Sequence, residues 1–243
     1  MSGHSHAKTV KHQKEATDAK RGKLFSKIAQ QILIAAKEKG GDQNTNSALR
    51  MVIEKAKEYN MPKENIERAI KKGTGELAGE SLESIIVEAY GPGGIAIIIE
   101  GIADNKNRAL GEIKQTLSQY GGKIANEGSV RWMFDRKGCI TLRITNKPKE
   151  ELELMAIEAG AEDICWHENV LDIYTKPDEL ERTKKLLEEK GIKIESASLD
   201  WTAKEEISVD EKTKETCQKL FEDLDELDSV QEIYCNIKSR EAG

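Results

Sequence analysis

The spacing of the apolar residues changes near residue 80 of this 243-residue chain. Before that point apolar side chains recur every three or four residues, as at Leu24, Ile28 and Ile32, which is the pattern of an amphipathic helix. After it, short runs such as residues 95–99 have the length and β-branched composition of buried strands. The sequence therefore predicts a helical N-terminal segment followed by mixed strands and helices.

Three helices are predicted in the N-terminal segment. The first is ended by Gly40 and Gly41, and the second follows capping candidates at residues 44, 46 and 47. The third opens at Pro62, which suits a first turn, and ends at Gly73. Apolar residues recur at helical spacing in each, so we expect a small helical domain with its own core.

Two strand-containing patterns follow. Residues 80–136 indicate two strands joined by a hairpin at residues 91–94, a helix capped by Asp104 and Asn105, and a short strand at 130–134. Residues 138–201 indicate the order β-α-β-β-α-β, which is typical of ferredoxin-like domains. One further helix and one further strand are expected after residue 203.

The predicted fold class is α+β, with a small helical domain followed by two ferredoxin-like domains, one inserted in the other. The predicted boundaries are residues 1–79 for the helical domain, 80–136 plus 203–243 for a discontinuous domain, and 137–202 for the inserted domain. Short connections favour this division. Three separate modules in a row are the alternative.

Charge is unevenly distributed along the chain. Residues 1–76 hold 16 Lys and Arg against 9 Asp and Glu, a net charge of +7, whereas residues 77–243 carry −13. Such asymmetry suggests a polyanion partner for the N-terminal part. A solvated helical surface without a partner is the alternative, and a protein-interaction scaffold built on the acidic part is another.

The strongest positive run is the N-terminal arm, which we define as residues 1–27. It contains seven Lys and Arg against two acidic residues and almost no apolar anchor. Flexible lysines suit contact with phosphates, and no Arg/Asn/Gln-rich recognition helix indicates base readout. The residues assigned to nucleic-acid contact are His4, Lys8, Lys11, His12, Lys14, Lys20, Arg21, Lys23 and Lys27 in the arm, with Arg68, Lys71 and Lys72 on the third helix.

No reaction class emerges from the sequence. His167, the only histidine outside the arm, shows no sign of a partnered base, and residues 91–94 lack a phosphate-binding motif. Four separated cysteines form no C-x-x-C pair and are expected to be free, buried thiols. We expect no enzyme activity, no metal, no cofactor and no small-molecule substrate. Without a membrane span or signal peptide, a cytoplasmic location is expected.

Several motifs resemble the YebC family. They are Gly3-His4-Ser5, Lys11-His12, residues 18–23, residues 60–75, residues 89–94, residues 104–108 and residues 128–132. The resemblance implies a three-domain fold and a DNA-binding transcriptional regulator. The family also includes a mitochondrial translational activator and ribosome-associated members, so the resemblance implies ribosomal RNA, transfer RNA or the ribosome as alternative partners. Ala7 stands where the family often has an aromatic residue.

Overall fold

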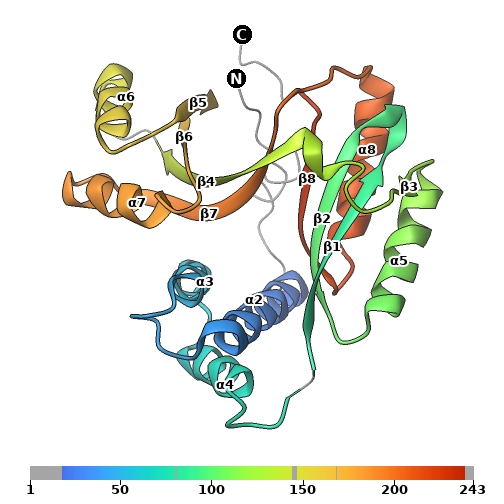
Figure 1. The fold of residues 1–243 in the computed structure, drawn as a ribbon, viewed down its shortest axis with the longest axis horizontal. Coiled ribbons are helices and arrows are strands. Elements are labelled where there is room, and N and C mark those ends of the chain that lie inside the picture. Colours follow the sequence, from blue (N-terminus) through green and yellow to red (C-terminus); the bar gives the residue numbers. More distant parts are fainter. Residues whose placement is uncertain (1–17, 80, 144–146, 168, 239–243) are drawn as a thin grey trace. The chain divides into compact units, whose positions relative to one another are not determined.

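The computed structural model describes residues 18–79, 81–143, 147–167 and 169–238, with side chains described from residue 21 (Figure 1). The chain forms two compact units. The described part of the larger unit comprises residues 18–130 and 210–233, and that of the smaller unit comprises residues 131–209 and 234–238, apart from the gaps above. The helical segment thus shares a unit with the first group of strands, and the predicted boundary at residue 79 stays a prediction.

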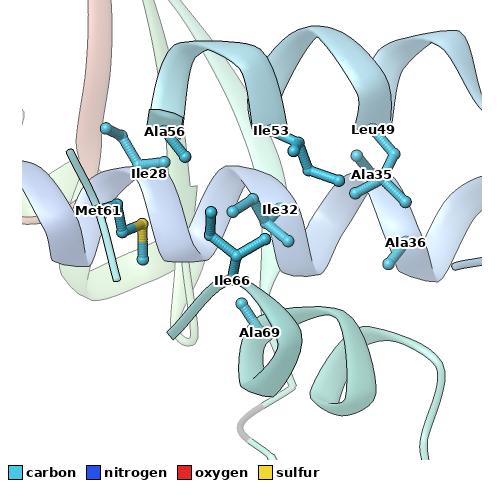
Figure 2. Close-up of a cluster of buried hydrophobic side chains, with 10 residues drawn as sticks. All are labelled: Ile28, Ile32, Ala35, Ala36, Leu49, Ile53, Ala56, Met61, Ile66 and Ala69. Carbon is cyan, nitrogen blue, oxygen red and sulfur yellow. The ribbon is translucent and has the colours of Figure 1, made fainter. Parts of the chain in front are cut away.

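Three helices open the larger unit, as the apolar spacing predicted. They are α2 (Asp18–Lys39), α3 (Ser47–Glu58) and α4 (Lys63–Gly73). Their apolar faces meet in one core, in which Ile32 of α2, Ile53 of α3 and Ile66 of α4 are buried (Figure 2). Because each helix contributes only one stripe to this core, the opposite faces are left to polar and charged residues.

A buried asparagine fixes the turn between α2 and α3. The Asn46 side chain accepts the Leu49 N–H at 3.0 Å and caps α3, which was one of the predicted capping positions. Its amide donates to the carbonyls of Ala35 and Gly40, each at 2.8 Å, near the end of α2. One fully buried side chain therefore satisfies backbone groups at both helix ends.

The larger unit also contains a four-stranded sheet of order β3-β1-β2-β8. Its elements are β1 (Glu83–Tyr90), β2 (Ala96–Ala103), α5 (Lys106–Gln119), β3 (Lys123–Ile124), α8 (Glu211–Asp225) and β8 (Val230–Cys235). β1 and β2 pair antiparallel through the short 3-10 turn η1 (Pro92–Gly94), so the predicted hairpin is confirmed. The last two residues of β8 belong to the smaller unit.

The smaller unit has the predicted β-α-β-β-α-β order. Its elements are η2 (Arg131–Met133), β4 (Phe134–Arg143), α6 (Lys149–Glu158), β5 (Asp163–His167), β6 (Val170–Thr175), α7 (Leu180–Glu189) and β7 (Ile194–Ala203). The sheet order is β5-β6-β4-β7, and its pairs are antiparallel. β4 and β7 pair along almost their whole lengths, with a bulge near Thr141. The α+β fold with an N-terminal helical part is confirmed.

Two local predictions were wrong. The expected strand at 130–134 is instead a turn followed by η2, because the buried Glu88 carboxylate accepts the N–H groups of Gly128 and Val130 at 2.8 and 2.6 Å. Asn105 alone caps α5, accepting the Arg108 N–H at 3.1 Å. Asp104 forms an ion pair with the Arg108 side chain instead.

Candidate nucleic-acid interface

The cationic residues assigned to nucleic acid fall into three groups. His4, Lys8, Lys11, His12 and Lys14 lie outside the described residues, as does the side chain of Lys20. Arg21, Lys23 and Lys27 lie in α2, and Arg68, Lys71 and Lys72 lie in α4. The structure therefore allows the group in α2 and the group in α4 to be compared directly.

Lys23 and Lys27 bind the C-terminal end of α8. The Lys27 ammonium donates to the Asp225 carbonyl at 2.6 Å and to its carboxylate at 3.1 Å. Lys23 donates to the carbonyl of Glu226 and to its carboxylate, the latter at 2.9 Å. Because Lys27 is only 8% exposed, its charge is directed into the larger unit. These two lysines hold the fold together, which their place in a basic run did not indicate.

The sequence of α8 explains why it needs these cations. Its last turn carries no basic residue, whereas Glu222, Asp223 and Asp225 crowd the end at which the helix dipole is already negative. The amines of α2 supply the missing positive charge and take up free carbonyl groups. Further polar contacts between α2 and β8 extend this joint, with Gln31 donating to Gln231 at 3.0 Å.

The cations of α4 are arranged differently. Arg68, Lys71 and Lys72 are all exposed, and their spacing of three and four residues places them along one side of the helix. Arg68 donates to Asn65 at 2.8 Å, which leaves its charge uncompensated by that contact. Arg21 of α2 is also exposed, with its guanidinium 5.6 Å from the Phe25 ring centroid. The row of Arg68, Lys71 and Lys72 can contact phosphates without breaking the contacts that Lys23 and Lys27 make.

Close packing against α2 fixes the end of α4 that carries Lys71 and Lys72. A Cβ atom at Gly73 would lie 2.5 Å from the Leu33 carbonyl oxygen and 2.7 Å from the Ala36 Cβ. Only glycine allows α4 and α2 to approach so closely there. The position of Lys71 and Lys72 therefore depends on the absence of one methyl group.

His167 lies at the end of β5, and its contact with Asp172 is an ion pair only when the imidazole is protonated. Its Nε2 lies 3.3 Å from a carboxylate oxygen of Asp172, which is buried and also accepts the Thr141 hydroxyl at 2.7 Å. Cys165 is paired with Asp172 across β5 and β6. Burial, followed by the nearby Asp172 carboxylate, raises the pKa of the Cys165 thiol to about 11, so the thiolate needed for nucleophilic chemistry is scarce at neutral pH.

The described residues contain no group of three or more histidine, cysteine or acidic residues placed to hold a metal ion. Within the same residues, no helix combines the length and apolar composition that crossing a bilayer requires. None of the four cysteines forms a disulfide; Cys139, Cys217 and Cys235 are buried, and Cys165 is half-buried. The exposed cations of α2 and α4 are the features that lead from this structure to a function.

Comparison with known proteins places this chain in a family. The model of the TACO1/YebC N-terminal domain matches residues 5–76, and the model of the TACO1/YebC second and third domain matches residues 82–237. Together these matches span most of the sequence. The chain belongs to the TACO1/YebC family.

Relatives across several bacteria share nearly the full length. A probable transcriptional regulatory protein of Halothermothrix orenii is 47% identical, over 97% of this chain and 94% of its own. Another, from Thermoanaerobacter pseudethanolicus, is 46% identical over 98% and 97%. The crystal structure of a conserved hypothetical protein from Aquifex aeolicus matches with a TM-score of 0.88 and 43% identity, covering 96% and 97% of the two chains. The names of the two relatives denote regulators and not enzymes.

Proposed function

We propose that this protein is a non-enzymatic, cytoplasmic regulator of gene expression that binds nucleic acid through the arm and the exposed cations of α4. The observation that carries the proposal is the exposed row of Arg68, Lys71 and Lys72 on a segment whose sequence is strongly basic. Phosphates are the ligands such a row fits, because several cations on one side meet several charges of a backbone. The names of the relatives support a role in transcription.

Lys23 and Lys27 have a positioning role in this proposal. They attach α2, whose first ten residues are the last part of the arm, to α8. The residues that would meet phosphate are then those of the arm other than these two lysines, together with the cations of α4. In the arm they are His4, Lys8, Lys11, His12, Lys14, Lys20 and Arg21. Contacts of this kind carry no base information, so binding is expected on many sequences.

Salt dependence tests the proposal directly. The slope of log affinity against log salt is negative, and each phosphate contact makes it steeper by roughly 0.7–0.9. Removing residues 1–14, which carry three lysines, should therefore make the slope shallower by about 2–3 units. The measurement is fluorescence anisotropy of the full chain and the truncated chain on duplex DNA and structured RNA at several salt concentrations.

A matched control separates phosphate contact from net charge. The Lys176→Gln/Lys193→Gln variant removes two exposed lysines of the smaller unit and should leave the slope unchanged. If the truncation also leaves it unchanged, residues 1–14 make no phosphate contacts. Sedimentation of cell lysate with and without nuclease then tests the biological target. Co-migration of the protein with ribosomes would assign it a role in translation. The absence of co-migration, together with enrichment of the protein at promoter DNA, supports a role in transcription.

A further inference from the structure

The helix α6 of the smaller unit (Figure 1) carries two exposed aliphatic side chains. Leu154 is 57% exposed and Ile157 is 61% exposed. Their spacing of three residues places them on one side of the helix, which we call the α6 stripe. Among the α-helices whose side chains the structure describes, α6 is the only one that exposes large apolar residues within its bounds. The stripe is therefore specific to this helix.

Packing within the smaller unit uses the opposite side of α6. Leu152 and Ala156 are buried there, about half a helical turn away from the stripe. The Trp166 indole of β5 donates to the Glu153 carboxylate at 2.6 Å, and the Lys149 ammonium lies 4.9 Å from the centroid of that indole ring. Because these contacts hold α6 in place, the stripe stays in water, and its two aliphatic side chains forgo the free energy that burial would give them.

Acidic residues border the stripe at both ends. Glu150 precedes Leu154 by four residues and Glu158 follows it by four, so both lie on the same side of α6 as the aliphatic pair. Glu150 is exposed, and Glu158 is paired with Lys190 of α7 at 2.5 Å. Residues 147–163 hold two lysines against six acidic residues, a net charge of −4, and Lys190 reduces it to −3. The surroundings of the stripe are therefore negative even after its ion pair is counted.

We infer that the α6 stripe binds a basic amphipathic helix of another protein. Such a helix would place two apolar residues on Leu154 and Ile157, and a lysine or arginine near Glu150 and near Glu158. Helices pack through side chains three and four residues apart, which is the spacing of the stripe. Opposite charges at both ends would fix the register of the partner helix and speed its association.

The charge of the stripe also separates this partner from two others. The phosphates of a nucleic acid would meet carboxylates here, which opposes their binding. A second copy of this chain, packed antiparallel on the stripe, would bring Glu150 of each copy towards Glu158 of the other, and like charges in an interface are unfavourable. The inference goes beyond the proposed function, because it gives the smaller unit a protein partner of its own.

Two helical peptides of about 18 residues, five helical turns, serve as fluorescein-labelled probes. Both carry a stripe of leucines, which is flanked by lysines in one peptide and by glutamates in the other. Leu154→Gln/Ile157→Gln removes the apolar groups of the stripe from the full-length protein. Leu77→Gln is the matched control, because Leu77 is an exposed leucine, 44%, outside α6. Circular dichroism melts of both variants should match the wild type, since neither removes a buried side chain.

The first readout is the apolar contact. The lysine peptide should bind the wild type, and Leu154→Gln/Ile157→Gln should weaken its binding by about 10- to 100-fold, because two aliphatic side chains lose the burial that binding gives them. Leu77→Gln should bind the lysine peptide as the wild type does. In spectra of ¹⁵N-labelled protein, the amide shifts that the lysine peptide causes should centre on residues 150–158.

The second readout is the charge. Glu150→Gln should weaken binding of the lysine peptide by about two- to fivefold, the effect of losing an exposed ion pair. Glu188→Gln, which removes an exposed carboxylate from α7 of the same unit, should leave binding unchanged. The glutamate peptide should bind the wild type about tenfold more weakly than the lysine peptide does, because its charges repel those around the stripe.

Four outcomes would overturn the inference. A lysine peptide that does not bind the wild type would remove its basis, and one that binds Leu154→Gln/Ile157→Gln equally well would show attraction by charge alone. A wild-type dimer in sedimentation equilibrium that this double variant converts to a monomer would assign the stripe to a second copy. Weaker binding of the double variant to duplex DNA would place nucleic acid on α6. The proposed function has its own readout, the salt slope, which should be equal in the double variant and the wild type.

Discussion

Lysines on α2 and α4 have similar sequence surroundings and different structural roles. Lys23 and Lys27 on α2 point to the C-terminal end of α8 and are held by its carbonyls and carboxylates. Lys71 and Lys72 on α4 are exposed. The difference shows that a basic run in the sequence does not tell which of its charges are paired within the fold and which stay exposed. A cation that binds the carbonyls and carboxylates at the C-terminal end of a helix is not available to a partner.

The largest expected effect concerns the packing that positions the α4 lysines. Gly73→Ala should lower the free energy of unfolding by about 2–3 kcal/mol, because the added Cβ meets a backbone carbonyl of α2 and over-packs the contact. Gly111→Ala is the matched control, since a Cβ there meets nothing within 4 Å. In the interior of α5 it should stabilise by roughly 0.5–1 kcal/mol.

Urea denaturation followed by circular dichroism measures both glycine variants. Tryptophan emission provides an internal comparison, because Trp132, Trp166 and Trp201 all lie in the smaller unit. A Gly73→Ala variant as stable as the wild type would mean that α4 shifts freely on α2. In that case the row of α4 cations would have no fixed position.

The next effect separates the two groups of lysines. Lys27→Gln should cost about 2 kcal/mol, less than the loss of one partner from a fully buried pair, because the Asp225 side chain is 40% exposed. The same variant should hardly change the salt slope of nucleic-acid binding. Lys71→Gln/Lys72→Gln should do the reverse, lowering stability by at most about 1 kcal/mol, because both exposed lysines complement the dipole in the last turn of α4, and making the slope shallower by roughly 1.4–1.8.

Urea denaturation and anisotropy titrations on the two proteins give all four values. The comparison fails if Lys27→Gln lowers the slope as much as the α4 variant does. It also fails if the α4 variant is the less stable of the two. Either result would assign the cations of α2 and α4 to the same role.

Local patterns of this sequence predicted much of the fold. Apolar spacing located the three N-terminal helices, and alternating strands and helices located the β-α-β-β-α-β order of the smaller unit. The hairpin at residues 91–94 was also predicted from local sequence. Gly93 and Gly94 adopt positive φ in the turn, which glycine does at little cost. These features depend on neighbours in sequence, which is where such patterns carry their information.

Contacts between distant residues explain the errors. Lys27 and Asp225 are 198 residues apart. Glu88, 42 residues from Val130, takes the N–H that a strand at 130–134 would have used. A usable signal existed in one case only: the acidic end of α8 lacks a basic residue of its own, so it required a cation from elsewhere.

The smallest expected effect concerns the N-terminal end of α8, where the interacting side chain is that of an acid, Asp210, and not of a lysine. The Asp210 carboxylate accepts the backbone N–H of Thr213 at 2.8 Å and its hydroxyl at 2.9 Å. These hydrogen bonds, the backbone one first, lower the pKa of Asp210 below its ordinary value of 3.8. A carboxyl whose pKa is depressed by folding stabilises the protein above its unfolded pKa and loses that contribution as the pH falls through the folded value.

Asp210→Asn tests this because asparagine also caps helices but does not titrate. The wild type should be slightly more stable than the variant near about pH 6, and the difference should shrink steadily as the pH falls below the unfolded pKa of about 3.9. Urea midpoints of both proteins across this range measure it. A difference that does not change with pH would show that the Asp210 charge adds nothing to its hydrogen bonds, and that α8 depends electrostatically on the lysines of α2 alone.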